Sequence, residues 1–267
     1  MNRDRNFSFD FIKIAATILI LLHHYQQHFG IHYQGINFYG GKFYFGWVVE
    51  LFFILSGFFM SRYVDRIQKG VRFRDFFFKR YFRLMPVMAI AAIVFQILNS
   101  MLILVRDGSF ERDGYSFWST VTAALGIHVG WGFDANHLAV NNPTWYIGVL
   151  LACYVWFFFL TWISGRTGTS PWIWYGVFVL IGVWGYSNNI TLPLFTPSTA
   201  RGIYSFFFGL VFSAFIQKTI DENGRLNYNT HTYIHTYIHS TIRDLFVCSI
   251  DSFGHSFTDK ILPSLHE

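Results

Sequence analysis

The feature that most constrains this chain is a series of long apolar runs. They occupy residues 11–29, 43–60, 84–104, 144–163, 172–186 and 201–217. About 20 apolar residues in a helix cross the hydrocarbon core of a bilayer, and a helix satisfies its own backbone hydrogen bonds there. The runs therefore predict an all-α, polytopic bundle of about six transmembrane helices.

Charge and cysteine content agree with this prediction. Charged residues make up 13% of the chain, about half of the ~25% typical of soluble domains. The net charge of +5 comes from basic residues grouped between apolar runs, as in cytoplasmic loops, so we expect membrane lipid and no nucleic acid as a partner. Cys153 and Cys248 form neither a disulfide framework nor a metal-site spacing.

The distribution of lysine and arginine predicts the orientation. Residues 61–83 hold eight basic and two acidic residues, whereas residues 30–42 hold one lysine. Because basic loops stay on the cytoplasmic side, we expect residues 61–83 and the N-terminus to be cytoplasmic. The apolar but glycine-broken stretch 119–133 is either a seventh span or a re-entrant or interfacial segment. Six crossings satisfy the charge rule, and seven place the basic residues after the last run outside.

The chain changes character after the last run. We expect a membrane domain over residues 1–216 and a polar, poorly ordered tail over 217–267. Residues 231–239 read HTYIHTYIH, which places three histidines on one face of a helix. These could form a metal site or be low-complexity sequence. We prefer the second interpretation and expect no metal site, because no carboxylate or cysteine completes a ligand set.

The first run contains ionisable residues, which are costly in a membrane and often functional. Lys13 and His24 are eleven residues apart, so they share a helix face and are separated by about 16 Å along its axis. Asp10 precedes Lys13 by one turn and can pair with it. Neutral imidazole can accept a proton, as a general base must. Alternatively, Lys13 extends to one interface and the histidines mark the other.

Two further charged residues lie in or next to apolar runs. Glu50 falls in the middle of the second run, where an unpaired carboxylate is costly. We expect it to be a functional group, one half of an ion pair with a neighbouring helix, or a protonated acid. Arg201 opens the last run and could bind an anionic group or anchor the helix at the interface.

Basic and aromatic residues alternate at the start of the third run. The segment KRYFRLMP covers residues 79–86, and Pro86 suits the first turn of a helix. Lys79, Arg80 and Arg83 could bind a phosphate-bearing ligand or could follow the charge rule with aromatic anchors.

Five segments, in this order, resemble acyltransferase family 3, a family of integral membrane O-acyltransferases. They are FDFIKIAATILILLHHY (9–25), FFILSGF (52–58), KRYFRLMP (79–86), PTWYIG (143–148) and RGIYSFFFGL (201–210). Lys13 stands where the family usually has arginine, and His24 has the family's spacing from it. Lysine keeps the positive charge but lacks the planar fork of arginine.

The resemblance implies an activity and roles for residues. An acyl group, commonly acetyl, passes from acyl-CoA on the cytoplasmic side of the bacterial inner membrane to a hydroxyl of a cell-surface glycan or its lipid-linked precursor. Acyl-CoA is then a substrate, and we expect no permanently bound cofactor. The expected catalytic residues are His24 as general base, with Lys13 and Asp10 on the same helix face. The expected substrate-binding residues are Lys79, Arg80, Arg83, Glu50, Trp145, Tyr146 and Arg201.

Family members usually have about ten spans, so we expect this chain to be a truncated copy. Such a copy could be catalytically active or inactive. Two alternatives remain. The chain could be a secondary transporter or flippase that uses Lys13, Glu50 and His24 as a proton relay. It could also be a non-catalytic remnant of an acyltransferase.

Overall fold

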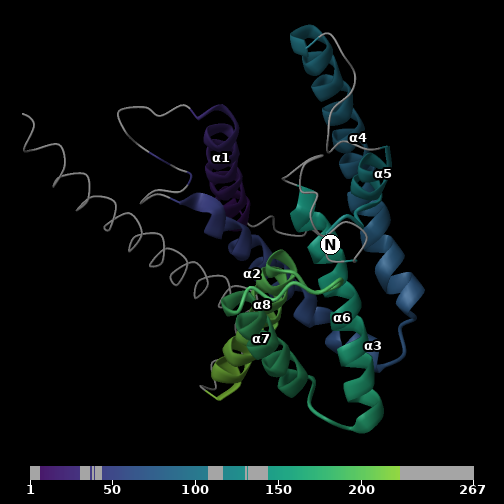
Figure 1. Ribbon diagram of the computed structural model, residues 1–267. Coiled ribbons are helices and arrows are strands. Elements are labelled where there is room, and N and C mark those ends of the chain that lie inside the picture. The colour runs from purple at the N-terminus through teal and green to yellow at the C-terminus, as the bar shows by residue number, and fades with distance from the viewer. Residues whose placement is uncertain are drawn as a thin grey trace, which may run out of the picture. The chain divides into compact units, whose positions relative to one another are not determined.

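A computed structural model of the chain, shown in Figure 1, describes residues 7–30, 37, 39, 44–107, 117–129, 131 and 144–222. These residues are almost entirely helical, and no strand occurs among them. The elements are α1 Phe7–Phe29, η1 Phe45–Trp47, α2 Val48–Met60, η2 Ser61–Tyr63, α3 Val64–Gln68, α4 Phe73–Asp107, α5 Phe117–Leu125, α6 Trp145–Thr167, α7 Pro171–Ser187 and α8 Pro197–Glu222. The all-α prediction is confirmed.

The chain divides into two compact units. Residues 13–214 form one unit, and residues 1–12 with 215–267 form the other. Of the second unit the structure describes only the first turns of α1 and the last turns of α8. The predicted domain boundary at residue 216 and the histidine repeat at 231–239 therefore stay predictions, since residues 223–267 lie outside the described part. Everything below concerns residues 13–214 unless stated otherwise.

Four helical segments are long and apolar enough to cross a membrane. They are Phe45–Gln68, Phe73–Leu98, Trp145–Thr167 and Pro197–Thr219. The expected number of about six is thus larger than the number that helix length and composition support within the described residues. The other two expected spans correspond to α1 and α7. Helix α7 has only 17 residues, and α1 carries Lys13 together with a polar last turn.

Contacts between side chains show in which direction each helix runs relative to its neighbours. Lys13 of α1 lies against Phe59 near the end of α2, and His23 lies against Tyr44 just before η1. Helices α1 and α2 are therefore antiparallel. Helix α8 runs parallel to α2, because Arg201 contacts Glu50 and, eleven to twelve residues further along both helices, Ser213 contacts Ser61.

Helix α6 also runs parallel to α2, because Trp145 at its start contacts Phe53. Near its end, Ser164 accepts a hydrogen bond from Gln68 at the end of α3, which belongs to the same helical segment Phe45–Gln68 as α2. Helix α4 is antiparallel to α6, since Phe73 contacts Phe158 and Phe76 contacts Tyr154. Helix α7 is antiparallel to α8 for a similar reason: its Tyr175 contacts Phe207, and its Tyr186 contacts Tyr204. The directions of α1, α2, α4, α6, α7 and α8 thus alternate along the chain, as six crossings require.

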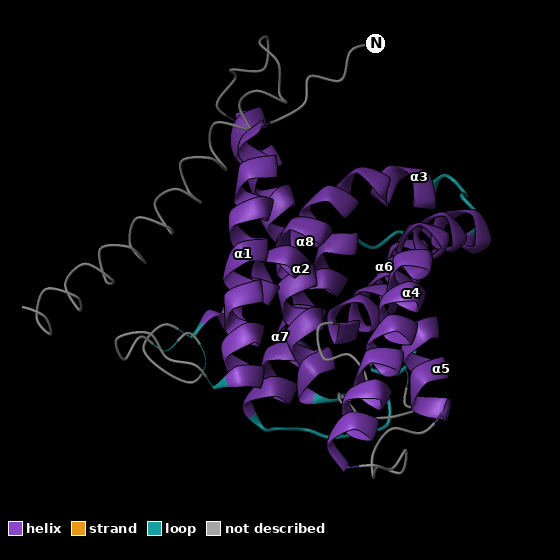
Figure 2. Cartoon of the chain, turned by 90° about the horizontal axis from the view of Figure 1, so that it is seen from above, coloured by secondary structure: helices purple, strands orange, loops and turns teal. Residues whose placement is uncertain are grey.

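Within the described residues of the stretch 119–133 there is no helix long enough for a further span. Helix α5 has nine residues, about 14 Å of helix, which is half of what the hydrocarbon core needs. It lies beside α4 in Figures 1 and 2, and Tyr81 of α4 donates a hydrogen bond to the carbonyl of Leu125 at its end. The alternative of a re-entrant or interfacial segment fits this geometry, and a seventh span does not.

The predicted start of the third span is wrong. Helix α4 begins at Phe73 and continues for 35 residues, so Pro86 lies inside the helix and not in its first turn. The segment 79–83 is therefore helical as well. Proline removes one backbone hydrogen bond. The helix continues past it because the other backbone groups have no water partner in an apolar setting and keep their helical bonds.

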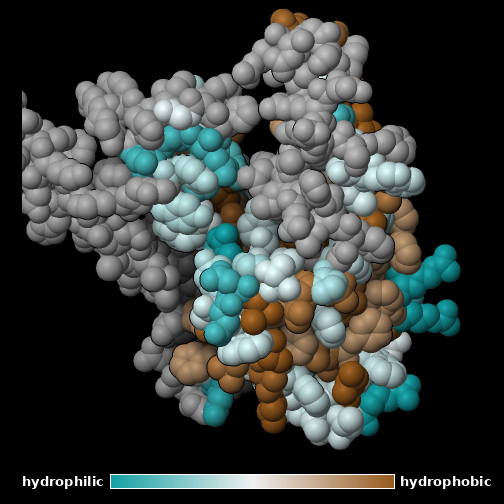
Figure 3. Space-filling view, in the orientation of Figure 1, coloured by the Kyte–Doolittle hydropathy of each residue, from teal (hydrophilic) through white to brown (hydrophobic). Residues whose placement is uncertain are grey.

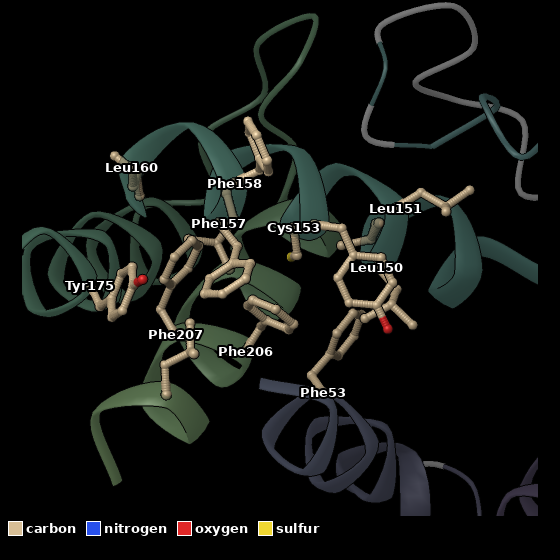
Figure 4. Packing of buried hydrophobic residues seen from close by; sticks show 14 of the residues in the cluster. Phe53, Leu150, Leu151, Cys153, Phe157, Phe158, Leu160, Tyr175, Phe206 and Phe207 are labelled. Carbon is tan, nitrogen blue, oxygen red and sulfur yellow. The ribbon is translucent and has the colours of Figure 1, made fainter. Parts of the chain in front are cut away.

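A hydrophobic core joins α2, α6, α7 and α8. Phe53, Phe157, Phe206 and Tyr175 are fully buried and point toward one another in Figure 4. The outward faces are apolar too: Val87 and Ile90 of α4 are 71% and 63% exposed. Hydrophobic side chains also gather over the lower half of the face seen in Figure 3. Apolar exposure on this scale is expected of helices that contact lipid.

Candidate functional site

Glu50 of α2 and Arg201 of α8 form an ion pair across the helix interface. Arg201 donates from Nε to Oε1 and from Nη2 to Oε2 of Glu50, both at 2.8 Å. This two-bond arrangement is the strongest that arginine makes with a carboxylate. The side chains are only 17% and 18% exposed. Of the alternatives for Glu50, the structure shows the ion pair with a neighbouring helix.

Three further groups surround this pair. Arg201 Nη2 also donates to the carbonyl of Gly46, at 2.9 Å, and its guanidinium lies 5.5 Å from the centre of the Trp145 ring. The Tyr204 hydroxyl donates to Glu50 Oε1 at 3.3 Å. Burial of two charges is costly unless hydrogen bonds satisfy both of them, and these contacts supply such bonds.

His24 is oriented by its neighbour Gln27. Its Nδ1 lies 2.9 Å from Gln27 Oε1. An amide oxygen can only accept, so Nδ1 is the donor, and in the neutral imidazole Nε2 is then the acceptor. A partly buried imidazole held in this tautomer has the form that a general base requires.

His23 is the more buried of the two histidines. It is 6% exposed, and its ring lies 5.1 Å from the rings of both Tyr39 and Tyr44. The two imidazoles are 5.3 Å apart in an edge-to-face arrangement. Sequence reasoning selected His24 from its spacing to Lys13, and the burial of His23 depends on tyrosines that carry no sequence signal.

Lys13 lies far from His24 along α1, as predicted. Its ammonium group is 5.6 Å from the centre of the Phe59 ring, near the end of α2 that leads into the basic segment 61–83. Asp10 lies on α1 within the other unit, and its side chain is outside the described residues. The predicted roles of Lys13 and Asp10 stay predictions.

Arg80 is held in a cage of three aromatic rings. Its guanidinium lies 3.8 Å from the ring centre of Phe76, 4.3 Å from that of Tyr63 and 5.7 Å from that of Tyr154. Its Nη1 donates to the carbonyl of Phe76 at 2.6 Å. By contrast, Lys79 and Arg83 are exposed. The three basic residues of the KRYFR segment thus have different environments, which the sequence does not reveal.

Tyr146 lies between α6 and α2. Its hydroxyl is 3.4 Å from Ser56 Oγ, and its ring centre is 4.6 Å from that of Phe53. Trp145 is 8% exposed and contacts Arg201, as described above. Both residues were expected at the acceptor side, and both lie at the end of α6 near the ion pair.

The predicted residues therefore gather at two ends of the unit. The imidazole end, defined by His23, His24, Glu50 and Arg201, also holds Trp145. The basic end, defined by Lys13, Lys79, Arg80 and Arg83, holds the cage. Helix α6 links the two ends, because its Trp145 contacts Arg201 and its Tyr154 contacts Arg80. Trp145 and Tyr154 are nine residues apart, which is about 14 Å along the helix.

Several residues of these sites were missed by sequence reasoning. Tyr204 follows Arg201 by one helical turn, so helical spacing could have found it. Gly46, Tyr39 and Tyr44 at the imidazole end, and Tyr63 and Tyr154 in the cage, lie far from their partners in sequence. Only the tertiary structure brings them to the charged groups.

The comparisons with known proteins fit this geometry. A family model described as an acyltransferase domain, that of acyltransferase family 3, matches residues 6–226. The chain belongs to acyltransferase family 3. The match covers every expected site residue and all of the helices that the structure describes. Comparison with curated proteins and with solved structures gave no significant match.

Family membership, together with helices long and apolar enough to span a bilayer, places the chain among the membrane acyltransferases. In the transporter alternative, a proton relay would connect Lys13, Glu50 and His24. Glu50 is bonded to Arg201, and Lys13 lies about three helical turns from His24.

Proposed function

We propose that this acyltransferase family 3 protein transfers an acyl group, acetyl in the simplest case, from acyl-CoA to a hydroxyl of a cell-surface carbohydrate or its lipid-linked precursor. In this proposal it is a multi-pass protein of the cytoplasmic membrane with its N-terminus in the cytoplasm. The basic end then faces the acyl-CoA pool, and the imidazole end faces the acceptor.

In the proposed reaction His24 Nε2 takes the proton from the acceptor hydroxyl while the oxygen attacks the thioester carbonyl. The new C–O bond forms, the C–S bond breaks, and the proton finally resides on the thiol of CoA. General-base catalysis of this kind contributes roughly 10²–10⁴-fold to the rate. A thioester is reactive enough that the step needs neither a metal nor a permanently bound cofactor.

The observation that carries the proposal is the hydrogen bond from His24 Nδ1 to Gln27 Oε1. It supports the base assignment because, in the neutral imidazole, a hydrogen on Nδ1 leaves Nε2 as the proton acceptor. The separation of His24 from Lys13 by about three turns of α1 also supports it, because donor phosphates and acceptor hydroxyl can then bind at different ends. For the donor, the exposed Lys79 and Arg83 are the proposed contacts of the CoA phosphates.

The test uses the full-length protein in membranes or lipid nanodiscs with radiolabelled acetyl-CoA and a lipid-linked glycan fraction. We expect His24→Ala to lower label transfer by about 10²–10⁴-fold. We expect Gln27→Ala to lower it less, about tenfold, because the imidazole stays but loses its orientation. Leu21→Ala on the exposed face of α1 is the matched control and should transfer at the wild-type rate.

Three outcomes distinguish the proposed enzyme from the alternatives. Transfer by the wild type that survives in His24→Ala would overturn the base assignment. Absence of transfer in well-inserted wild type would favour the non-catalytic remnant. Transport of a solute without any acyl-CoA requirement would favour the transporter alternative.

A further inference from the structure

We infer that Glu50 and Arg201 do not bind substrate but act as positioning residues that hold the segment around Gly46 and, through Tyr44, fix the two imidazoles. This inference rests on the proposed function for its catalytic meaning, while its structural part can be tested without catalysis. It assigns the ion pair a role different from the one expected from the sequence.

Donors of Arg201 are already used in hydrogen bonds within the protein. Its Nε and Nη2 bond to the carboxylate of Glu50, and Nη2 also bonds to the Gly46 carbonyl. The guanidinium carbon also lies over the Trp145 ring, 5.5 Å from its centre. An anionic substrate group would have to displace a two-bond carboxylate and leave Glu50 buried without its partner, which is costly.

The bond from Arg201 to Gly46 holds the turn that contains Gly46. Gly46 lies in the short η1 turn that precedes α2, and it is buried. The Arg201–Gly46 bond connects this turn before α2 to the start of α8, 155 residues away in sequence. The position of the turn is therefore set by the ion pair and not by local sequence alone.

Tyr44 connects this turn to the two histidines. The ring of Tyr44 packs so closely on Gly46 that a Cβ at residue 46 would collide with it. The same ring contacts His23, with centres 5.1 Å apart, and His23 contacts His24 at 5.3 Å. A contiguous series of contacts thus runs from Arg201 through Gly46, Tyr44 and His23 to the proposed base.

Two variants test this series of contacts, each at a different residue. Gly46→Ala forces the Tyr44 ring away while leaving both members of the ion pair in place. Arg201→Lys keeps the charge but lacks the planar fork whose two nitrogens bond both carboxylate oxygens of Glu50 while one of them also reaches Gly46. The matched control is Gly176→Ala on α7, where a new Cβ meets nothing within 4 Å.

The primary measurement is the rate at which diethyl pyrocarbonate modifies His23, followed by peptide mass spectrometry on full-length protein in nanodiscs. We expect at least a fivefold faster modification of His23 in Gly46→Ala and Arg201→Lys than in wild type, and no change in Gly176→Ala. The second measurement is acyl transfer, where we expect kcat to fall about tenfold while KM for acetyl-CoA and for the acceptor stays within twofold.

The outcomes separate this inference from the proposed function. Unchanged His23 reactivity in both variants overturns the positioning role, and so does a rise in KM for the acceptor at constant kcat in Arg201→Lys, which is the result for direct substrate binding. If wild-type protein transfers no label, the proposed function fails, yet the change in His23 reactivity still decides whether the ion pair fixes the histidines.

Discussion

Gly57 of α2 lies directly against the backbone carbonyl of Phe206 on α8. A Cβ at residue 57 would overlap that carbonyl oxygen, and a Cβ at Gly209 would overlap the carbonyl of Ile54 on the opposite helix. Small residues facing each other let two helix backbones approach closely, as is common between membrane helices. This crossing lies between the Glu50–Arg201 pair and the Ser61–Ser213 pair, so it sets the distance at which both can form.

Replacement of Gly57 by alanine should therefore weaken the α2–α8 contact. The added methyl meets backbone, which cannot move aside as a flexible side chain would, so we expect a loss of about 2–3 kcal/mol in the free energy of unfolding. Unfolding of purified protein by increasing SDS in mild detergent measures this. Gly176→Ala has open space around it and should be neutral. Equal stability of both variants would show that the close crossing is absent.

Thr161 and Tyr175 provide a second test of the packing. The two hydroxyl oxygens are 2.5 Å apart, and Thr161 also donates to the carbonyl of Phe157, so Tyr175 is the donor to Thr161. Tyr175→Phe should cost about 1 kcal/mol, since Thr161 keeps its own acceptor. Thr161→Val should cost more, about 2–3 kcal/mol, because it leaves the Tyr175 hydroxyl buried without its partner. The reverse order in SDS unfolding would contradict this donor assignment.

The basic residues of segment 79–83 should differ in function. Arg83 and Lys79 are exposed, so each alanine substitution should weaken CoA binding by about 1 kcal/mol, roughly fivefold. Salt should reduce the difference. Isothermal titration of full-length protein with CoA, and with CoA that lacks its 3′-phosphate, measures this contribution. Undiminished CoA binding by the double variant would remove these residues from the donor site.

Arg80 should instead matter for stability. Arg80→Lys keeps the charge but loses the planar contact with the rings of Phe76 and Tyr63. We expect a cost of about 1–2 kcal/mol in unfolding free energy. Arg83→Lys serves as the exposed control and should unfold like wild type. A stable Arg80→Lys variant with weak CoA binding would show that Arg80 contacts the donor directly.

The orientation can be tested with single cysteines. In a Cys248→Ser background, Lys69→Cys lies in the basic segment and Thr191→Cys lies in the loop between α7 and α8; both native side chains are exposed. The charge rule predicts that a membrane-impermeant maleimide labels residue 191 but not residue 69 on intact cells. The native Cys153 is buried and should not react. The opposite pattern would place the basic end outside and remove it from the acyl-CoA pool.

Much of the fold follows from hydrophobic length and from short motifs. The predicted runs 144–163 and 172–186 correspond closely to α6 and α7, because aromatic and apolar residues fill nearly all of both helices. The order of the five motifs was sufficient to identify the family. The start of α4 was wrong, because an apolar run marks only the part of a helix in lipid. Helix α4 begins 13 residues before Pro86 with charged residues included.

What the sequence determined by itself is therefore local: which segments are helical and apolar, where positive charge accumulates, and that His24 shares a helix with Lys13. Only the tertiary structure decided that Glu50 pairs with Arg201, that Arg80 lies among three rings while Arg83 is exposed, and that His23 is covered by Tyr44. The physical reason is that helix formation and lipid burial depend on consecutive residues. Ion pairs and aromatic cages depend on how helices from separate parts of the chain pack, because Glu50 lies 151 residues from Arg201 and Arg80 lies 74 residues from Tyr154. The packing is set by close contacts such as that of Gly57 with Phe206.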